Sequence, residues 1–313
     1  MPVTVPVNRD YDPAYGEAVA LSPLVRRVLA RNPSPFTFHG TGTYLVGRAA
    51  LAVIDPGPAD DAHLAAILKA AGGTPITHIL VTHTHVDHSP LAAALKAATG
   101  AATYGYGPHG SLRGGDHVRL EEAGDTAFVP DVTLRDGDRI AGADFTFEAV
   151  FTPGHTSNHM CFALIEEGAF FPGDHVMGWS TTVVGAPDGD MRAYLRSLER
   201  LTARGERVYY PTHGAPIGGP HDAMGREPRA YVETLIAHRR DREAQILDCL
   251  ARGIGRIPEM VAAMYADVDR RLHPAAAMSV FSHILAMTED RRILTDGPPG
   301  PASLYRLPER SAP

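Results

Sequence analysis

The chain has 313 residues, 44% of them hydrophobic, and a formal net charge of −7 at pH 7. This length and apolar content suit one large domain plus a small one, and the acidic balance implies no membrane-surface or polyanion partner. Because the N-terminus and the rest of the chain lack a long apolar run, we expect no signal peptide and no membrane span. Cys161 and Cys249 form no CxxC motif. We expect two buried free thiols, which suits a cytoplasmic protein.

Short strands alternate with helical patterns up to about residue 220. The run Leu51–Asp55 predicts a strand, and residues 60–71 predict a helix after a Pro-Gly-Pro turn. A β-branched run at 76–81 predicts a buried strand, and residues 91–98 predict a helix that Ser89 caps. With a further helix predicted over 191–203, the pattern indicates a mixed α and β layered domain.

The segment Thr82–His88 places three imidazoles and a carboxylate between a predicted strand and a predicted helix. Catalytic groups commonly lie on such loops, because the flanking elements hold them rigidly. Residues two apart in an extended segment point the same way, so His83 and His85 can reach one metal ion. Asp87 and His88 follow the turn and can reach a second ion. Imidazole with carboxylate favours zinc, with iron and manganese as alternatives.

Three further predicted strands each end in a ligand-type side chain. They are 145–151 before His155, 169–171 before Asp174, and 207–210 before His213. Gly or Pro at each strand end lets the backbone turn there. A single His after a strand is weak evidence for a site, but these three loops and the His-rich loop together supply seven candidate ligands.

On these residues the chain resembles the metallo-β-lactamase superfamily of di-metal hydrolases. The resemblance spans roughly residues 20 to 220, and every ligand position of the family is filled, by His83, His85, Asp87, His88, His155, Asp174 and His213. The segments 32–37 and 40–47, with a helical extension after His213, resemble the beta-lactamase-like protein 2 branch. One departure is Gly42, in a loop that borders the family's site, where relatives often carry Asn.

The resemblance implies an α+β fold, the αββα metallo-β-lactamase sandwich, with the metals at one edge of its two sheets. It implies one metal on His83, His85 and His155, and another on Asp87, His88 and His213. Asp174 would bridge the two, and Asp87 and Asp174 would be the catalytic residues. Two Zn²⁺, or Fe or Mn in their place, would share a bridging hydroxide that attacks the substrate.

Several other side chains are candidates for supporting roles around this site. His159 and His175 would support the ligands or face the substrate, although packing roles explain them equally well. Trp179 would line the entrance or belong to the core. His109 and His117, in a Gly-rich excursion over 105–131, would reach the substrate or remain solvated.

Beyond residue 220 the pattern becomes helical. Helices are predicted over 229–251, 258–265 and 274–287, followed by two strands at 291–294 and 303–307 that a Gly/Pro link joins. This order predicts a winged-helix-like domain over 221–313, after a catalytic domain over 1–220. The domain holds thirteen Arg, no Lys, and thirteen Asp plus Glu. It therefore lacks the basic excess of a nucleic-acid binder, and we interpret it as a cap over the active site.

The predicted function is metal-dependent hydrolysis of a small ester, thioester or lactone. The alternative is single-strand RNA cleavage, as in the beta-lactamase-like protein 2 branch, for which Arg239, Arg240 and Arg242 would offer local basic charge. A third class is an iron-dependent oxygenase or a DNA-binding protein with a vestigial metal site. The complete ligand set speaks against a vestigial site. The oligomeric state stays open, a homodimer included.

Overall fold

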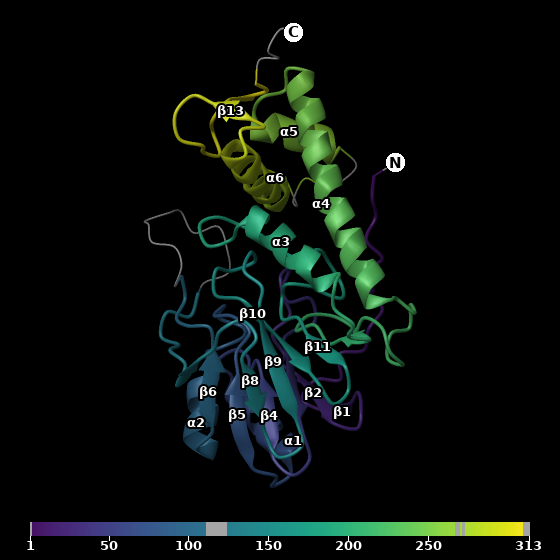
Figure 1. Cartoon of the computed structure of the whole chain (residues 1–313), viewed down its shortest axis with the longest axis vertical. Helices are drawn as coiled ribbons and strands as arrows, with labels where there is room; N and C mark the ends of the chain where they lie inside the picture. Colours follow the sequence, from purple (N-terminus) through teal and green to yellow (C-terminus); the bar gives the residue numbers. More distant parts are fainter. Residues whose placement is uncertain (1, 111–123, 267–269, 271–272, 309–313) are drawn as a thin grey trace.

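A computed structural model describes residues 2–110, 124–266, 270 and 273–308. Two β-sheets lie face to face, with helices on both outer surfaces, and a helical module extends beyond one end of the sheets (Figure 1). The first sheet has the order β1-β2-β3-β4-β5-β6-β7 and the second the order β12-β11-β10-β9-β8. The expected αββα sandwich with a C-terminal helical module is confirmed.

The strands of the two sheets follow one another along the chain. The first sheet comprises β1 Val19–Ala20, β2 Val25–Leu29, β3 Gly42–Val46, β4 Leu51–Ile54, β5 Ile76–Leu80, β6 Ala102–Gly105 and β7 Val132–Thr133. The second comprises β8 Arg139–Ala141, β9 Thr146–Phe151, β10 Met160–Leu164, β11 Ala169–Phe171 and β12 Val208–Tyr209. Every residue of the central strands β3 and β10 is buried, as expected for strands covered on both faces.

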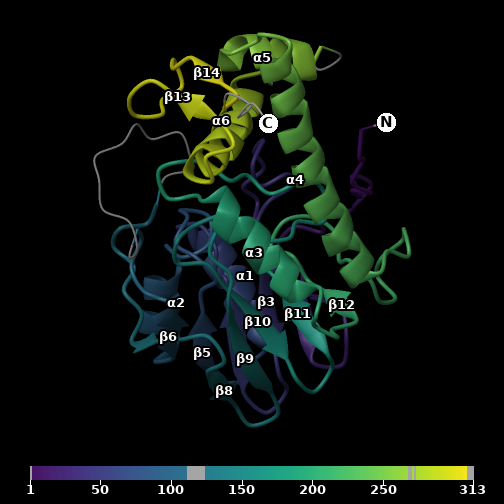
Figure 2. The ribbon, with the colours of Figure 1, turned by 45° about the horizontal axis from the view of Figure 1, so that its top comes forward.

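Three apolar layers hold the sandwich together. The layer between the sheets contains Tyr44, Ile54, Phe147, Phe162 and Phe171 among others. A second layer joins the first sheet to α1 (Asp61–Ala71) and α2 (Ala92–Thr99). The third joins the second sheet to α3 (Met191–Leu201) and α4 (Pro228–Ala251). Figure 2 shows α3 lying across the second sheet, beside α4.

Strand direction brings four loops to one edge of the sandwich. β11 pairs with β12 in parallel, and β9 and β11 both run antiparallel to β10 between them. The chain therefore leaves β9, β11 and β12 at the same edge of the second sheet. In the first sheet β4 and β5 are parallel, so their ends also lie together. Of these strand ends, those of β5, β9, β11 and β12 precede the predicted ligands.

The C-terminal module consists of α5 (Ile257–Met264), α6 (His273–Glu289) and the second half of α4, with the antiparallel pair β13 (Leu294–Thr295) and β14 (Tyr305–Arg306). The predicted helices and the strand pair are confirmed within a few residues. The first half of α4, including Tyr231 and Leu235, packs in the third layer of the sandwich. The division into residues 1–220 and 221–313 remains a proposal.

Two local predictions differ from the structure. Ser89 does not cap α2, which begins after Leu91 with no side-chain cap, because the Ser89 hydroxyl donates to Asp125 instead. The basic cluster over 239–242 lies only partly at the surface. Arg239 is buried, because this side of α4 packs against α3, whereas Arg240 is exposed and pairs with Glu199 at 2.7 Å. In the described part of the chain no helix has the length and apolarity to span a bilayer.

Candidate metal centre

All seven predicted ligands meet at the edge where the four loops converge, and all seven side chains are buried. Tight turns bring them there. Gly173, just before Asp174, has φ +54°, and a Cβ there would lie 2.8 Å from the Thr82 hydroxyl. Gly154, before His155, has φ +144°, and a Cβ there would collide with the Tyr194 backbone. Only glycine allows these two loops to approach their neighbours so closely.

Three imidazoles form the first group. His83 Nε2 lies 3.0 Å from His85 Nδ1, and His155 Nε2 lies 3.1 Å from the same atom. Three nitrogens bound to one zinc ion at about 2.1 Å each would lie roughly 3.4 Å apart in tetrahedral geometry. The spacing therefore fits a single cation.

Asp87, His88 and His213 form the second group. Asp87 Oδ2 lies 3.3 Å from His88 Nε2 and 3.1 Å from His213 Nε2. This group again has the compact spacing of ligands around one ion, here with one carboxylate and two imidazoles.

Asp174 lies between the two groups and presents one carboxylate oxygen to each. Its Oδ1 lies 3.6 Å from His88 Nε2 and 3.4 Å from His213 Nε2, whereas Oδ2 faces His155 Nε2 at 3.8 Å. A carboxylate in this position can bridge two cations.

Several nitrogen and oxygen atoms of the predicted ligands make no hydrogen bond and are therefore free to bind a metal. Among the described residues, no hydrogen bond reaches His88 Nε2, Asp174 Oδ1 or His213 Nε2, although all three atoms are buried and face the other ligands. Buried polar atoms without partners are rare in native proteins. A cluster of them on imidazoles and carboxylates fits a metal-binding site.

The electrostatics of the two groups differ. Burial holds the pKa of His83 and of His85 well below its usual value, so both rings are neutral and can offer a lone pair. Burial also acts to lower the pKa of His213, but the Asp174 and Asp87 carboxylates raise it to about 10. The two carboxylates thus favour positive charge at this position, which bound cations would supply.

Asp55 is a functional residue that the sequence analysis did not identify. Its side chain accepts hydrogen bonds from His88 Nδ1 at 2.9 Å, Thr82 Oγ1 at 2.8 Å and Thr212 Oγ1 at 2.9 Å. It thereby orients one ligand and ties two ligand loops together, as carboxylates behind metal-bound imidazoles commonly do. The sequence feature that could have identified Asp55 is its place directly after a fully buried strand.

Backbone carbonyls orient two other imidazoles. His213 Nδ1 donates to Gly40 O at 3.0 Å, and His155 Nδ1 donates to Val183 O at 2.6 Å. Each bond fixes the ring so that Nε2 faces the site. Gly42 lies close to Arg27 and Thr212, which leaves little space for a side chain at this position. The Asn that the resemblance led us to compare with Gly42 therefore has no equivalent in this site.

The supporting candidates have distinct positions. His159 Nε2 accepts from the Asp174 backbone N–H at 3.3 Å, and its ring stacks on His83. His175 is fully buried against Tyr194 and does not face a substrate. His109 lies at the rim, 3.0 Å from the Thr84 hydroxyl. His117 lies outside the described residues.

Trp179 forms a stacked ring pair with Phe38, with centroids 4.7 Å apart and an interplanar angle of 8°. Both rings are half-buried. Trp179 packs against Gly214, next to the ligand His213, and Phe38 lies two residues before Gly40, which holds the same ligand. The ring pair therefore belongs to the two loops that enclose His213.

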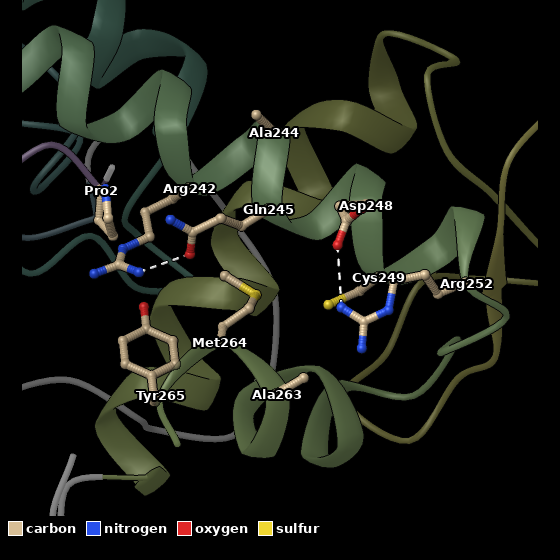
Figure 3. A pocket seen from close by; sticks show the side chains of 10 residues that line it. All are labelled: Pro2, Arg242, Ala244, Gln245, Asp248, Cys249, Arg252, Ala263, Met264 and Tyr265. Carbon is tan, nitrogen blue, oxygen red and sulfur yellow. Dashed lines mark hydrogen bonds and ion pairs between the residues drawn. The ribbon is translucent and has the colours of Figure 1, made fainter. Parts of the chain in front are cut away.

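A separate hollow of about 590 Å³ lies between α4 and α5 (Figure 3). Arg242 and Arg252 line it but are hydrogen-bonded to Gln245 and Asp248. None of the seven candidate ligands lines this hollow, so it is distinct from the metal centre.

Comparison with known proteins agrees with this geometry. Residues 37–213 match the model of the metallo-beta-lactamase superfamily, and residues 257–298 match that of the beta-lactamase associated winged helix domain. The fold is similar to a beta-lactamase domain protein from Burkholderia ambifaria, with a TM-score of 0.72, 20% identity and 96% of each chain covered.

Two fungal relatives match along most of the chain. The lactamase-like protein adaB of Aspergillus niger is 30% identical, over 92% of this chain and 87% of the relative. The atrochrysone carboxyl ACP thioesterase of Aspergillus fumigatus is 34% identical, over 90% of this chain and 86% of the relative. Together with the buried His/Asp cluster, these matches show that the chain is a hydrolase of the metallo-beta-lactamase superfamily, with a beta-lactamase associated winged helix domain at its C-terminal end.

Proposed function

We propose that this chain is a di-metal hydrolase that cleaves an acyl thioester. The observation that carries the metal assignment is the position of Asp174, which turns one oxygen to each of two ligand groups. His83, His85 and His155 would hold one cation, and Asp87, His88 and His213 the other. Nitrogen-rich sites of this kind favour Zn²⁺.

A pair of bound cations would supply hydroxide at neutral pH and polarise the carbonyl of the substrate. The side chains of the protein would orient the attacking hydroxide. Asp87 Oδ1 is buried and has no hydrogen-bond partner in the described part of the chain, so it is free to accept a hydrogen bond from the attacking hydroxide and orient it. The seven side chains are buried, and electrostatic contacts with a developing oxyanion are stronger in such low-dielectric surroundings.

Two observations support an acyl thioester as the substrate. A relative of 34% identity is named as a thioesterase that acts on an acyl carrier protein. The half-buried Phe38–Trp179 pair lies on the loops around His213, where it would give an apolar contact for a flat acyl group. The balanced charge of residues 221–313 gives no added attraction for RNA.

The metal assignment is tested by reconstituting the metal-free protein and measuring its metal content. We expect elemental analysis to approach two zinc ions per chain, and a chelator to abolish thioester turnover until zinc is restored. A protein that retains a single redox-active iron and consumes oxygen would instead be an oxygenase, and the hydrolytic proposal would fail.

A further inference from the structure

The segment Thr182–Val184 lies between the metal centre and the C-terminal helices. Towards the metal centre, Val183 O accepts a hydrogen bond from His155 Nδ1 at 2.6 Å. The Thr182 hydroxyl donates to the backbone carbonyl of Asp174 at 2.7 Å. This one segment therefore contacts a ligand of the first group and the bridging carboxylate residue.

The same segment is held from the other side by two helices. Arg239 of α4 donates from Nη2 to Thr182 O, and Ser282 of α6 donates from Oγ to Val184 O at 2.6 Å. Three consecutive carbonyls thus have three different partners, of which the middle one is the ligand His155. Since residues 180–184 belong to no helix or strand, these side chains take the place of backbone hydrogen bonds.

Arg239 is an unusual residue to find inside the protein. It is 3% exposed, and its guanidinium lies 5.4 Å from the centre of the Tyr194 ring. Its Nε makes no hydrogen bond to any described residue. Burying a guanidinium costs considerable free energy unless its hydrogen bonds repay it. The hydrogen bond to Thr182 O and the contact with the Tyr194 ring are the interactions that hold it in this position.

We propose that Arg239 and Ser282 are positioning residues of the metal centre. By fixing the carbonyls of Thr182 and Val184 they fix Val183 O, which in turn aims His155 Nε2 at His85 and Asp174. Helices α4 and α6 then support metal binding through the segment Thr182–Val184. This inference rests on the proposed metal site.

The test measures metal affinity in the full-length chain, not turnover. Metal-free wild type, Ser282→Ala and Arg239→Met are titrated with Co²⁺ against a competing chelator, and the visible absorption reports the ligand geometry. Residues behind metal ligands typically change affinity about 10- to 100-fold. We expect each variant to bind the ion of the His83, His85 and His155 group about tenfold more weakly, with an altered spectrum.

Each variant has a matched control on the same helix. Thr288→Val removes a hydroxyl that donates only to Ile284 O within α6, and Arg240→Met removes an exposed guanidinium from α4. We expect both controls to bind Co²⁺ like wild type. Thermal unfolding followed by circular dichroism shows which proteins are folded, and if Arg239→Met does not fold, Ser282→Ala decides the question.

The possible results separate the two proposals. If wild type binds Co²⁺ and Ser282→Ala and Arg239→Met match their controls in affinity and spectrum, the positioning role is wrong while the metal site stands. A lowered melting temperature with unchanged affinity would also exclude the positioning role. If wild type itself binds neither Co²⁺ nor Zn²⁺, the proposed function fails and the positioning role fails with it.

Discussion

Asp55 Oδ2 lies 2.9 Å from His88 Nδ1, and neither side chain is accessible to solvent. The carboxylate accepts a hydrogen bond from Nδ1–H, so that Nε2 faces Asp87 and Asp174. Because Asp55 also binds the hydroxyls of Thr82 and Thr212, one buried carboxylate connects loops from both sheets.

Asp55→Asn should weaken metal binding without unfolding the chain. The amide keeps the size of the side chain but replaces one acceptor oxygen with a donor group. We therefore expect a 10- to 100-fold loss of affinity for the metal held by His88. Competition titration with a chelator measures it, and Asp125→Asn, which removes a carboxylate bonded to Ser89, is the control. Equal affinity in both variants would show that Asp55 only fastens the loops.

Asp174→Ala should remove the group that joins the two metal sites. We expect turnover to fall by roughly a thousandfold, since the contribution of a bound cation to such chemistry is several kcal/mol and each 1.36 kcal/mol is tenfold. Metal content should drop from two towards one. Because the residue lies on a loop, far-ultraviolet circular dichroism should remain that of wild type. Hydrolysis at the wild-type rate would exclude a bridging role.

His63 should make the stability of the protein fall in mild acid. Burial lowers the pKa of His63 to about 4, whereas an unfolded histidine titrates near 6.5. Between these values the unfolded chain binds a proton that the folded chain does not. The free energy of unfolding should therefore decrease by roughly 2 kcal/mol between pH 7 and pH 5 through this residue alone.

The variant His63→Gln isolates this contribution. The Thr43 hydroxyl donates to Asp55 O, so it accepts from His63 Nε2, and a Gln amide can replace that donor. Urea unfolding at pH 7 and pH 5 should show a smaller loss of stability in the variant than in wild type. Parallel losses would mean that His63 is already accessible to protons in the folded state.

Trp179→Ala should affect substrate binding more than the chemical step. Losing one ring of the Phe38–Trp179 pair would remove the apolar contact proposed for the acyl group, and such contacts act equally on the substrate and the transition state. We expect KM for an aromatic acyl thioester to rise about tenfold with kcat nearly unchanged. Phe36→Ala, an exposed ring on the same loop as Phe38, should leave KM alone. A selective loss of kcat would instead show that Trp179 acts in the chemical step.

The strands and the seven ligand candidates could be predicted because they depend on local pattern. Each ligand follows a buried apolar run, and parallel strands bring such positions to one edge. Asp55 has the same placement after β4, but a single carboxylate before Pro-Gly-Pro is typical of a turn. Its partners Thr82, His88 and Thr212 lie far away in sequence, so only the folded chain identifies its role.

The roles of α4 residues could not be predicted for a similar reason. The periodicity of α4 predicts a helix, but the helix packs on the sandwich with its first half and on α5 and α6 with its second. Its buried face therefore changes along its length. Arg239 lies at this junction and points inward, whereas its neighbour Arg240 stays at the surface.

The most direct measurement compares two substrates in the zinc-reconstituted full-length chain. One is an aromatic acyl thioester of N-acetylcysteamine, and the other is a single-stranded RNA, each assayed at about 50 and about 200 mM salt. We predict hydrolysis of the thioester with kcat/KM nearly independent of salt, and intact RNA. RNA cleavage that weakens steeply with salt, with the thioester left unhydrolysed, would contradict thioester hydrolysis as the function, since that dependence marks contacts to phosphates.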